Sequence, residues 1–163
     1  MSYTMAAPLS APTDIEAGGP VPTGSRPGRH RVFETAGIPL LAARWVPFQH
    51  EIEIEGVDLA TAQVALQIRD RKDGDRLLAA LSRVDAPDSE GLRVTSRVRD
   101  KVPITTVHIH IAETTMEAID VARERGEPGG DAVLWWDLHV SPASGVKFVA
   151  FEGSFIVRAG VTR

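Results

Sequence analysis

Apolar and polar residues alternate over short stretches of the chain from about Phe33 onward, with turn residues between the stretches. In the stretch 48–55, Phe48, Ile52 and Ile54 fall on one face and four polar residues fall on the other. A period of two is typical of a half-buried β-strand. The same reading predicts further strands at residues 64–69, 77–84, 92–99, 105–111, 133–140 and 147–157. Polar turns, among them Asp73-Gly74, join most of these strands at hairpin length, so we expect an antiparallel β-sandwich.

One short helix is expected between two of these strands. Thr114 and Glu117 have the spacing of a capping box, in which a hydroxyl and a carboxylate satisfy free backbone N–H groups at a helix N-terminus. The segment 123–130, which holds a proline and a glycine pair, ends the helix after about two to three turns. The apolar residues that would face the core are Met116, Ile119 and Ala122.

The first 32 residues differ from the rest in composition. Proline and glycine recur in them, at Pro8, Pro12, Gly18, Gly19, Pro20, Pro22, Gly24, Pro27 and Gly28. Such a segment cannot build a core of its own and favours extended backbone. We therefore divide the chain into an extended N-terminal arm, residues 1–32, and a β-sandwich domain, residues 33–163. The arm is either a leader without a role or a segment that orders along a neighbouring subunit through its apolar residues, which are Tyr3, Met5, Leu9, Ile15 and Val21.

Length, charge and cysteine count narrow the possible classes of protein. The chain has 163 residues, 43% of them hydrophobic, and a formal net charge of −4, which suits one domain with a tail. Because no long basic block is present, binding to nucleic acid or to an anionic membrane is not expected. No stretch has the roughly 18 consecutive apolar residues of a spanning helix, and the N-terminus does not read as a secretory signal. The absence of cysteine excludes disulfides and thiolate metal sites and fits a reducing compartment.

The sequence gives an enzyme little support. His108 and His110 share a face of one predicted strand, and His139 would join them if its strand lay next to theirs, so that zinc could bind with Asp137 as a further ligand. Two histidines at strand spacing are nevertheless more often surface residues. The carboxylates at positions 51, 53 and 55 read as the solvated face of a strand, and no Gly-x-Ser-x-Gly elbow is present. We therefore expect no catalytic, metal-binding or cofactor-binding residues and no cofactor.

Two features are candidates for contact with other proteins. Arg93, Arg97 and Arg99 lie on the outer face of a predicted strand. They are either solvated or meet an acidic partner, and their charge is opposite to that of the glutamate row, so identical subunits could dock face to edge through the two rows. Trp135 and Trp136 are adjacent in one strand and point to opposite faces. One of them therefore meets another element, either the arm or a neighbouring subunit, and we assign this role to Trp135.

Five segments of the chain carry a pattern seen in known proteins. They are EGVDL at 55–59, VALQIRD at 64–70, LWWDLHV at 134–140, FEGSFIV at 151–157 and GVTR at 160–163, with a turn ending at Gly145 between the third and fourth. Together, over roughly residues 45–163, they resemble the small immunoglobulin-like β-sandwich modules of tailed-bacteriophage virion proteins. The insert at 114–130 and the long arm distinguish this chain from those modules.

The resemblance implies an immunoglobulin-like β-sandwich with a structural role. Such modules occur in tail, baseplate, fibre-anchoring and head-tail proteins. We therefore expect a non-enzymatic subunit of the tail, baseplate or fibre-attachment apparatus, in a virion assembled in the host cytoplasm. It would form homo-oligomers and dock to other virion structural proteins, without nucleic acid or membrane. The alternative is a carbohydrate- or receptor-binding module, in which an exposed Trp135 stacks on a sugar ring.

Overall fold

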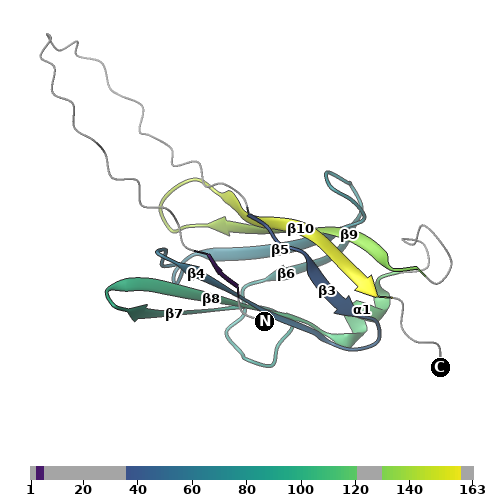
Figure 1. Cartoon of the computed structure of the whole chain (residues 1–163), viewed down its shortest axis with the longest axis horizontal. Helices are drawn as coiled ribbons and strands as arrows, with labels where there is room; N and C mark the ends of the chain where they lie inside the picture. The colour runs from purple at the N-terminus through teal and green to yellow at the C-terminus, as the bar shows by residue number, and fades with distance from the viewer. Residues whose placement is uncertain (1–2, 6–35, 121–129, 159–163) are drawn as a thin grey trace, which may run out of the picture.

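Two β-sheets packed face to face form the body of the molecule (Figure 1). They are seen in a computed structural model, which describes residues 3–5, 36–120 and 130–158. In spatial order, sheet A contains β1 (Tyr3–Met5), β4 (Phe48–Glu55), β8 (Val102–Ile111) and β7 (Gly91–Arg99). Sheet B contains β2 (Ala36–Gly37), β10 (Phe148–Arg158), β9 (Ala132–Ser141), β5 (Gln63–Arg69) and β6 (Leu77–Ser82), and β3 (Leu40–Ala43) also pairs with β10.

The strand order is that of an immunoglobulin-like sandwich. The neighbours β4, β8 and β7 correspond to strands B, E and D of such a domain, and β10, β9, β5 and β6 correspond to G, F, C and C′. These neighbours pair in antiparallel fashion, whereas β1 runs parallel to β4, and β2 and β3 run parallel to β10. The expected fold class, a mainly β immunoglobulin-like sandwich with one short helix, is confirmed.

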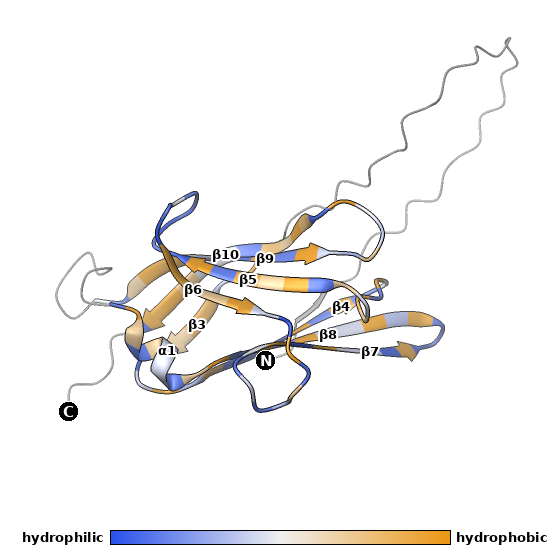
Figure 2. Ribbon diagram, turned by 180° about the vertical axis from the view of Figure 1, so that it is seen from behind, coloured by the Kyte–Doolittle hydropathy of each residue, from blue (hydrophilic) through white to orange (hydrophobic). Residues whose placement is uncertain are grey.

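The core lies between the sheets and is built by the alternation that the sequence shows. Along β9, every second residue from Ala132 to Val140 is buried, and burial alternates in the same way along β5. In Figure 2 the strands of both sheets carry orange, apolar bands between blue, polar ones. Phe48 of sheet A meets Phe155 of sheet B edge to face, with ring centroids 5.2 Å apart. Burial of these apolar side chains is the main stabilising contribution, because the chain has no disulfide.

Two short strands near the start of the domain were missing from the sequence-based prediction. In β3, Leu40 and Ala42 are buried while Leu41 and Ala43 are exposed. All four residues are apolar, so the sequence shows no alternation that would mark a strand. β2 spans only two residues and is positioned by β10, with which it pairs.

A glycine within a strand often marks a β-bulge, but Gly153 of β10 has another role. The register irregularity of β10 instead lies between Val149 and Phe151. Gly153 sits beneath the backbone of Ile38, whose N–H donates to the Glu152 carbonyl at 2.9 Å and whose carbonyl accepts from Trp136 Nε1 at 2.9 Å. A Cβ at Gly153 would collide with the Ile38 backbone, so the missing side chain lets the segment between β2 and β3 lie directly against β10.

The helix is shorter than expected and is capped in another way. α1 covers Glu113–Ala118, with Ala112 as its N-cap, so the predicted capping box between Thr114 and Glu117 is wrong. Glu90, from the loop before β7, accepts hydrogen bonds from the Ala112 N–H at 2.9 Å and from Thr115 Oγ1 at 2.8 Å. The predicted core residues Met116 and Ile119 are buried, while Ala122 lies outside the described residues. No helix in the described part of the chain is long and apolar enough to cross a membrane.

Candidate interface surfaces

The outer face of sheet A, which points away from sheet B, carries both charged rows that the sequence singled out. β4 and β7 both pair with β8, so Glu51, His108 and Arg93 lie in one row across the three strands. On the same face, Arg97 Nη2 donates to Glu53 Oε1 at 3.1 Å. The two rows are therefore neighbours in one chain and partly neutralise each other there, which leaves less charge for docking between subunits.

His108 is fixed at the centre of this face by two polar neighbours. Its Nδ1 lies 2.8 Å from Glu51 Oε1, and its Nε2 lies 3.1 Å from Thr95 Oγ1. Both ring nitrogens thus have partners from the flanking strands. The arrangement ties β4, β8 and β7 together across the surface.

The three-histidine metal site considered from the sequence is wrong. His108 and His110 belong to β8 in sheet A, whereas His139 belongs to β9 in sheet B. All three face outward from the sandwich, so His139 points away from the other two, and it lies 2.8 Å from Asp137 Oδ1. Among the residues that the structure describes, no cluster of three metal-ligating side chains is found.

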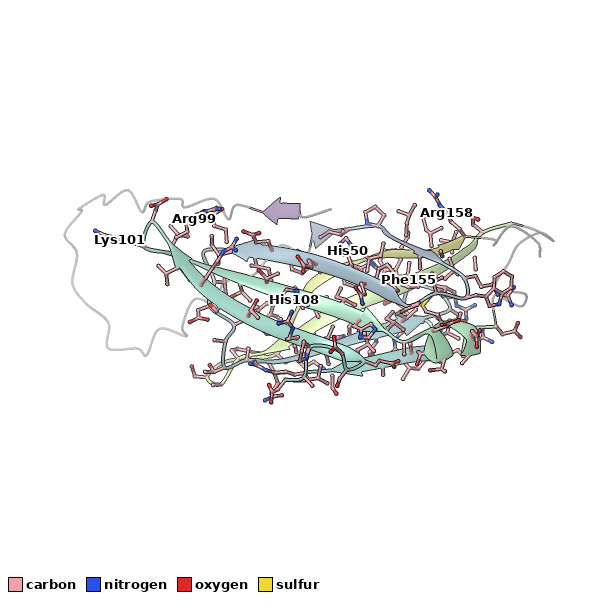
Figure 3. All side chains as sticks on the ribbon, turned by 90° about the horizontal axis from the view of Figure 1, so that it is seen from below. His50, Arg99, Lys101, His108, Phe155 and Arg158 are labelled. Atoms are coloured by element: carbon pink, nitrogen blue, oxygen red, sulfur yellow. The ribbon has the colours of Figure 1, made fainter. Side chains whose placement is uncertain are left out.

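The β7–β8 hairpin projects past the end of sheet B (Figures 1 and 3). Val98 is 73% exposed there, although its alternation with the arginines would place it on the core face of a fully covered strand. Arg97 and Arg99 are exposed beside it, and Arg99 and Lys101 lie at the projecting end in Figure 3. The turn residues Asp100 and Lys101 have φ values of 52° and 69°, a left-handed conformation that is costly for residues other than glycine.

The adjacent tryptophans separate as the sequence predicts. Trp136 is fully buried, while Trp135 is half-buried on the outer face of sheet B. Among the described residues, the β5–β6 turn meets Trp135, and its Lys72 places Nζ 4.9 Å from the centre of the Trp135 ring. Lys72 also pairs with Glu152 Oε1 at 3.1 Å. Trp135 therefore has a cation above its ring before any partner binds.

An apolar row crosses the outer face of sheet B close to Trp135. Ile156 of β10 pairs in register with Leu41 of β3 on one side and with Val133 of β9 on the other. Leu41 is 51% exposed and Val133 is 58% exposed. The sequence-based reading did not identify this row, because its members come from three strands and only the register brings them together.

The arm residues are placed only in part. Tyr3 lies in β1, which pairs with β4 at the edge of sheet A. The other predicted contact residues of the arm, Leu9, Ile15 and Val21, lie outside the described residues. The assignment of the arm to an interface stays a prediction.

Three polar residues that the sequence-based reading passed over hold the loop between β4 and β5. Buried Thr105 donates from Oγ1 to the Val57 carbonyl at 2.7 Å and accepts from the Leu59 N–H at 3.1 Å. Arg83 donates to the carbonyls of Ala60 and Ala62, both at 2.7 Å. Asp58 accepts from the Ala60 N–H and from Ser96 Oγ, and these hydrogen bonds lower the pKa of its carboxyl group. The loop is thereby tied to the base of the β7–β8 hairpin.

Comparison with known proteins does not assign this chain to a family. No protein-family model matches the sequence, and no curated protein matches it. Among solved structures, a chain of the ZIG-8–RIG-5 IG1–IG1 heterodimer is similar over 82% of this chain and 90% of its own length, at 10% identity and a TM-score of 0.30. The fold assignment rests on the strand order described above.

Proposed function

We propose that this chain is a non-enzymatic structural subunit of a tailed-phage virion, in the tail, baseplate or fibre-attachment apparatus. It acts by associating with copies of itself and by docking to neighbouring virion proteins. The resemblance over residues 45–163 supports the class of protein, and the immunoglobulin-like sandwich agrees with it. The surface features support a role in contact with other proteins.

The main structural support for this proposal is the projecting β7–β8 hairpin. Its end contributes no side chain to the core, so ordering it costs conformational entropy with little apolar burial in return. It nevertheless exposes Val98 and two arginines on a turn with two left-handed residues. Arginine is enriched in protein interfaces. A docking element explains both why the hairpin projects and why it exposes Val98 and two arginines.

A pair of matched substitutions tests this role. Val98 is 73% exposed in the hairpin and Val146 is 70% exposed after β9, so aspartate at either position should leave the sandwich folded. We expect V98D to reduce incorporation into particles at least tenfold in a complementation assay, and V146D to incorporate like the wild type. Equal incorporation of both variants would exclude the hairpin as the docking element.

The carbohydrate-binding alternative has less support in the structure. A sugar ring would have to stack on Trp135, whose ring already has the Lys72 ammonium group above it. A glycan array probed with the purified chain tests the alternative directly. We expect no binding above buffer, and a reproducible hit that is lost in W135A would favour it over the virion role.

A further inference from the structure

β1 occupies a place in sheet A that another copy of the same strand could fill. Tyr3, Thr4 and Met5 pair in parallel with Ile52, Glu53 and Ile54 of β4. Without β1, β4 would be the outer strand of sheet A, since its other side pairs with β8. An outer strand presents a row of unpaired backbone N–H and C=O groups, which readily accept a further strand.

The attachment of β1 to its own domain is slight. It makes three residue pairs with β4, whereas β8 makes eight pairs with the other side of that strand. The chain segment that joins β1 to β4 is also long. Forty-two residues lie between Met5 and Phe48, whereas a parallel connection needs only about a dozen.

The composition of the arm indicates that its strand-forming part is the first few residues, at the end of the arm that is farthest in sequence from the sandwich domain. Residues 1–7 contain neither proline nor glycine, whereas residues 8–28 contain five prolines and four glycines. Proline cannot donate a backbone hydrogen bond to a neighbouring strand and excludes the segment that holds it from regular pairing. β1 is therefore a short pairing segment at the end of a long connection that does not itself favour pairing.

The connection is long enough for β1 to reach the β4 edge of a neighbouring copy of the chain. Thirty residues lie between Met5 and Ala36, and that number of residues, fully extended, spans about 100 Å. The β4 edge of an adjacent copy in an oligomer is thus within reach, as is the edge of the same domain.

We propose that in the assembled protein β1 of one copy adds to the β4 edge of a second copy of this chain, in the register seen here. The proposal rests on the structural role given above and names the partner at this edge. Exchange keeps the number of backbone pairs and adds a link between subunits, which is why strand exchange is a low-cost route to oligomers.

Disulfide trapping in the full chain tests the exchange. The wild type has no cysteine, so two introduced cysteines form the only possible link. Thr4 and Glu53 are register partners in neighbouring strands, and Cα atoms in such positions are about 5 Å apart, within disulfide reach. Chains with T4C and chains with E53C, carrying different affinity tags, are co-expressed, oxidised gently and analysed for the peptide that joins residues 4 and 53. Because each cysteine is on a different chain, this link forms only by exchange.

The control replaces E53C by Q49C, an exposed position on the same outer face of β4 but outside the register of β1. We expect the 4–53 link between chains to exceed the 4–49 link at least tenfold. A 4–53 link that forms only when both cysteines are in one chain would overturn the proposal, and so would the absence of any 4–53 link. If the link fails while the chain is present in purified particles, the structural role stands and only strand exchange is lost. Absence of the chain from particles contradicts the structural role itself.

Discussion

Gly153 lets the Ile38 backbone lie directly against β10, so a single added methyl group at this residue should destabilise the protein. In G153A, the added Cβ would collide with the Ile38 backbone, which is held by hydrogen bonds to Glu152 and Trp136 and cannot move freely. We expect a loss of about 1–3 kcal/mol in the free energy of unfolding, as for other overpacked sites. The matched control is G37A, because a Cβ at Gly37 meets no atom within 4 Å. Chemical denaturation of both variants measures the effect, and equal stability of the two would contradict the close approach.

His50 gives the protein a defined dependence on pH. This residue is half-buried and stacks on Phe48, with the two ring centroids 6.1 Å apart. Burial lowers the pKa of His50 below its ordinary value of 6.5. Below pH 6.5, the unfolded chain therefore binds a proton more readily than the folded chain, so this contribution to stability is complete above pH 6.5 and is lost as the pH falls.

The melting temperatures of the wild type and H50Q, measured from pH 7.5 to pH 5, test this sign. We expect the melting temperature of the wild type to fall more steeply than that of H50Q as the pH decreases below 6.5. Parallel curves would show that His50 does not contribute to the pH dependence.

At the scale of the elements, the loop before β7 controls the start of α1. The Glu90 carboxylate accepts hydrogen bonds from the Ala112 N–H and from Thr115 Oγ1, so it acts as the cap that Ala112 lacks. We expect E90A to lower the free energy of unfolding by about 1 kcal/mol, as for the loss of other helix caps. D88A removes an exposed carboxylate from the same loop and should leave stability unchanged within experimental error. Thermal unfolding of E90A and D88A tests this prediction. Equal melting temperatures for the two variants would contradict the capping role of Glu90.

The sequence predicted those features that depend on neighbouring residues and missed those that depend on residues far apart in the chain. Alternation located β4, β5 and β7–β10 because antiparallel strands with one buried face repeat every two residues. It missed β3, in which Leu41 and Ala43 are as apolar as their buried neighbours. It also misplaced the helix cap, because Glu90 lies 22 residues before the Ala112 that it caps.

In the whole molecule, candidate residues lie close together only when their strands belong to the same sheet and lie near each other in it. The sequence predicted that Trp135 and Trp136 separate, since adjacent residues of a strand point to opposite faces. It could not place β8 and β9 in different sheets, which separates His108 from His139, nor bring Glu53 to Arg97 across β8. The apolar row of Leu41, Ile156 and Val133 also depends on pairing between distant strands.

We propose that this chain is a structural part of a tailed-phage particle. The most direct test is quantitative mass spectrometry of gradient-purified particles of a tailed phage that carries the gene for this chain, after a high-salt wash that removes loosely bound protein. We predict that the chain is present in a fixed number of copies per particle, a multiple that matches the symmetry of the tail or baseplate. Its absence from washed particles, when it is abundant in the lysate, would contradict the account.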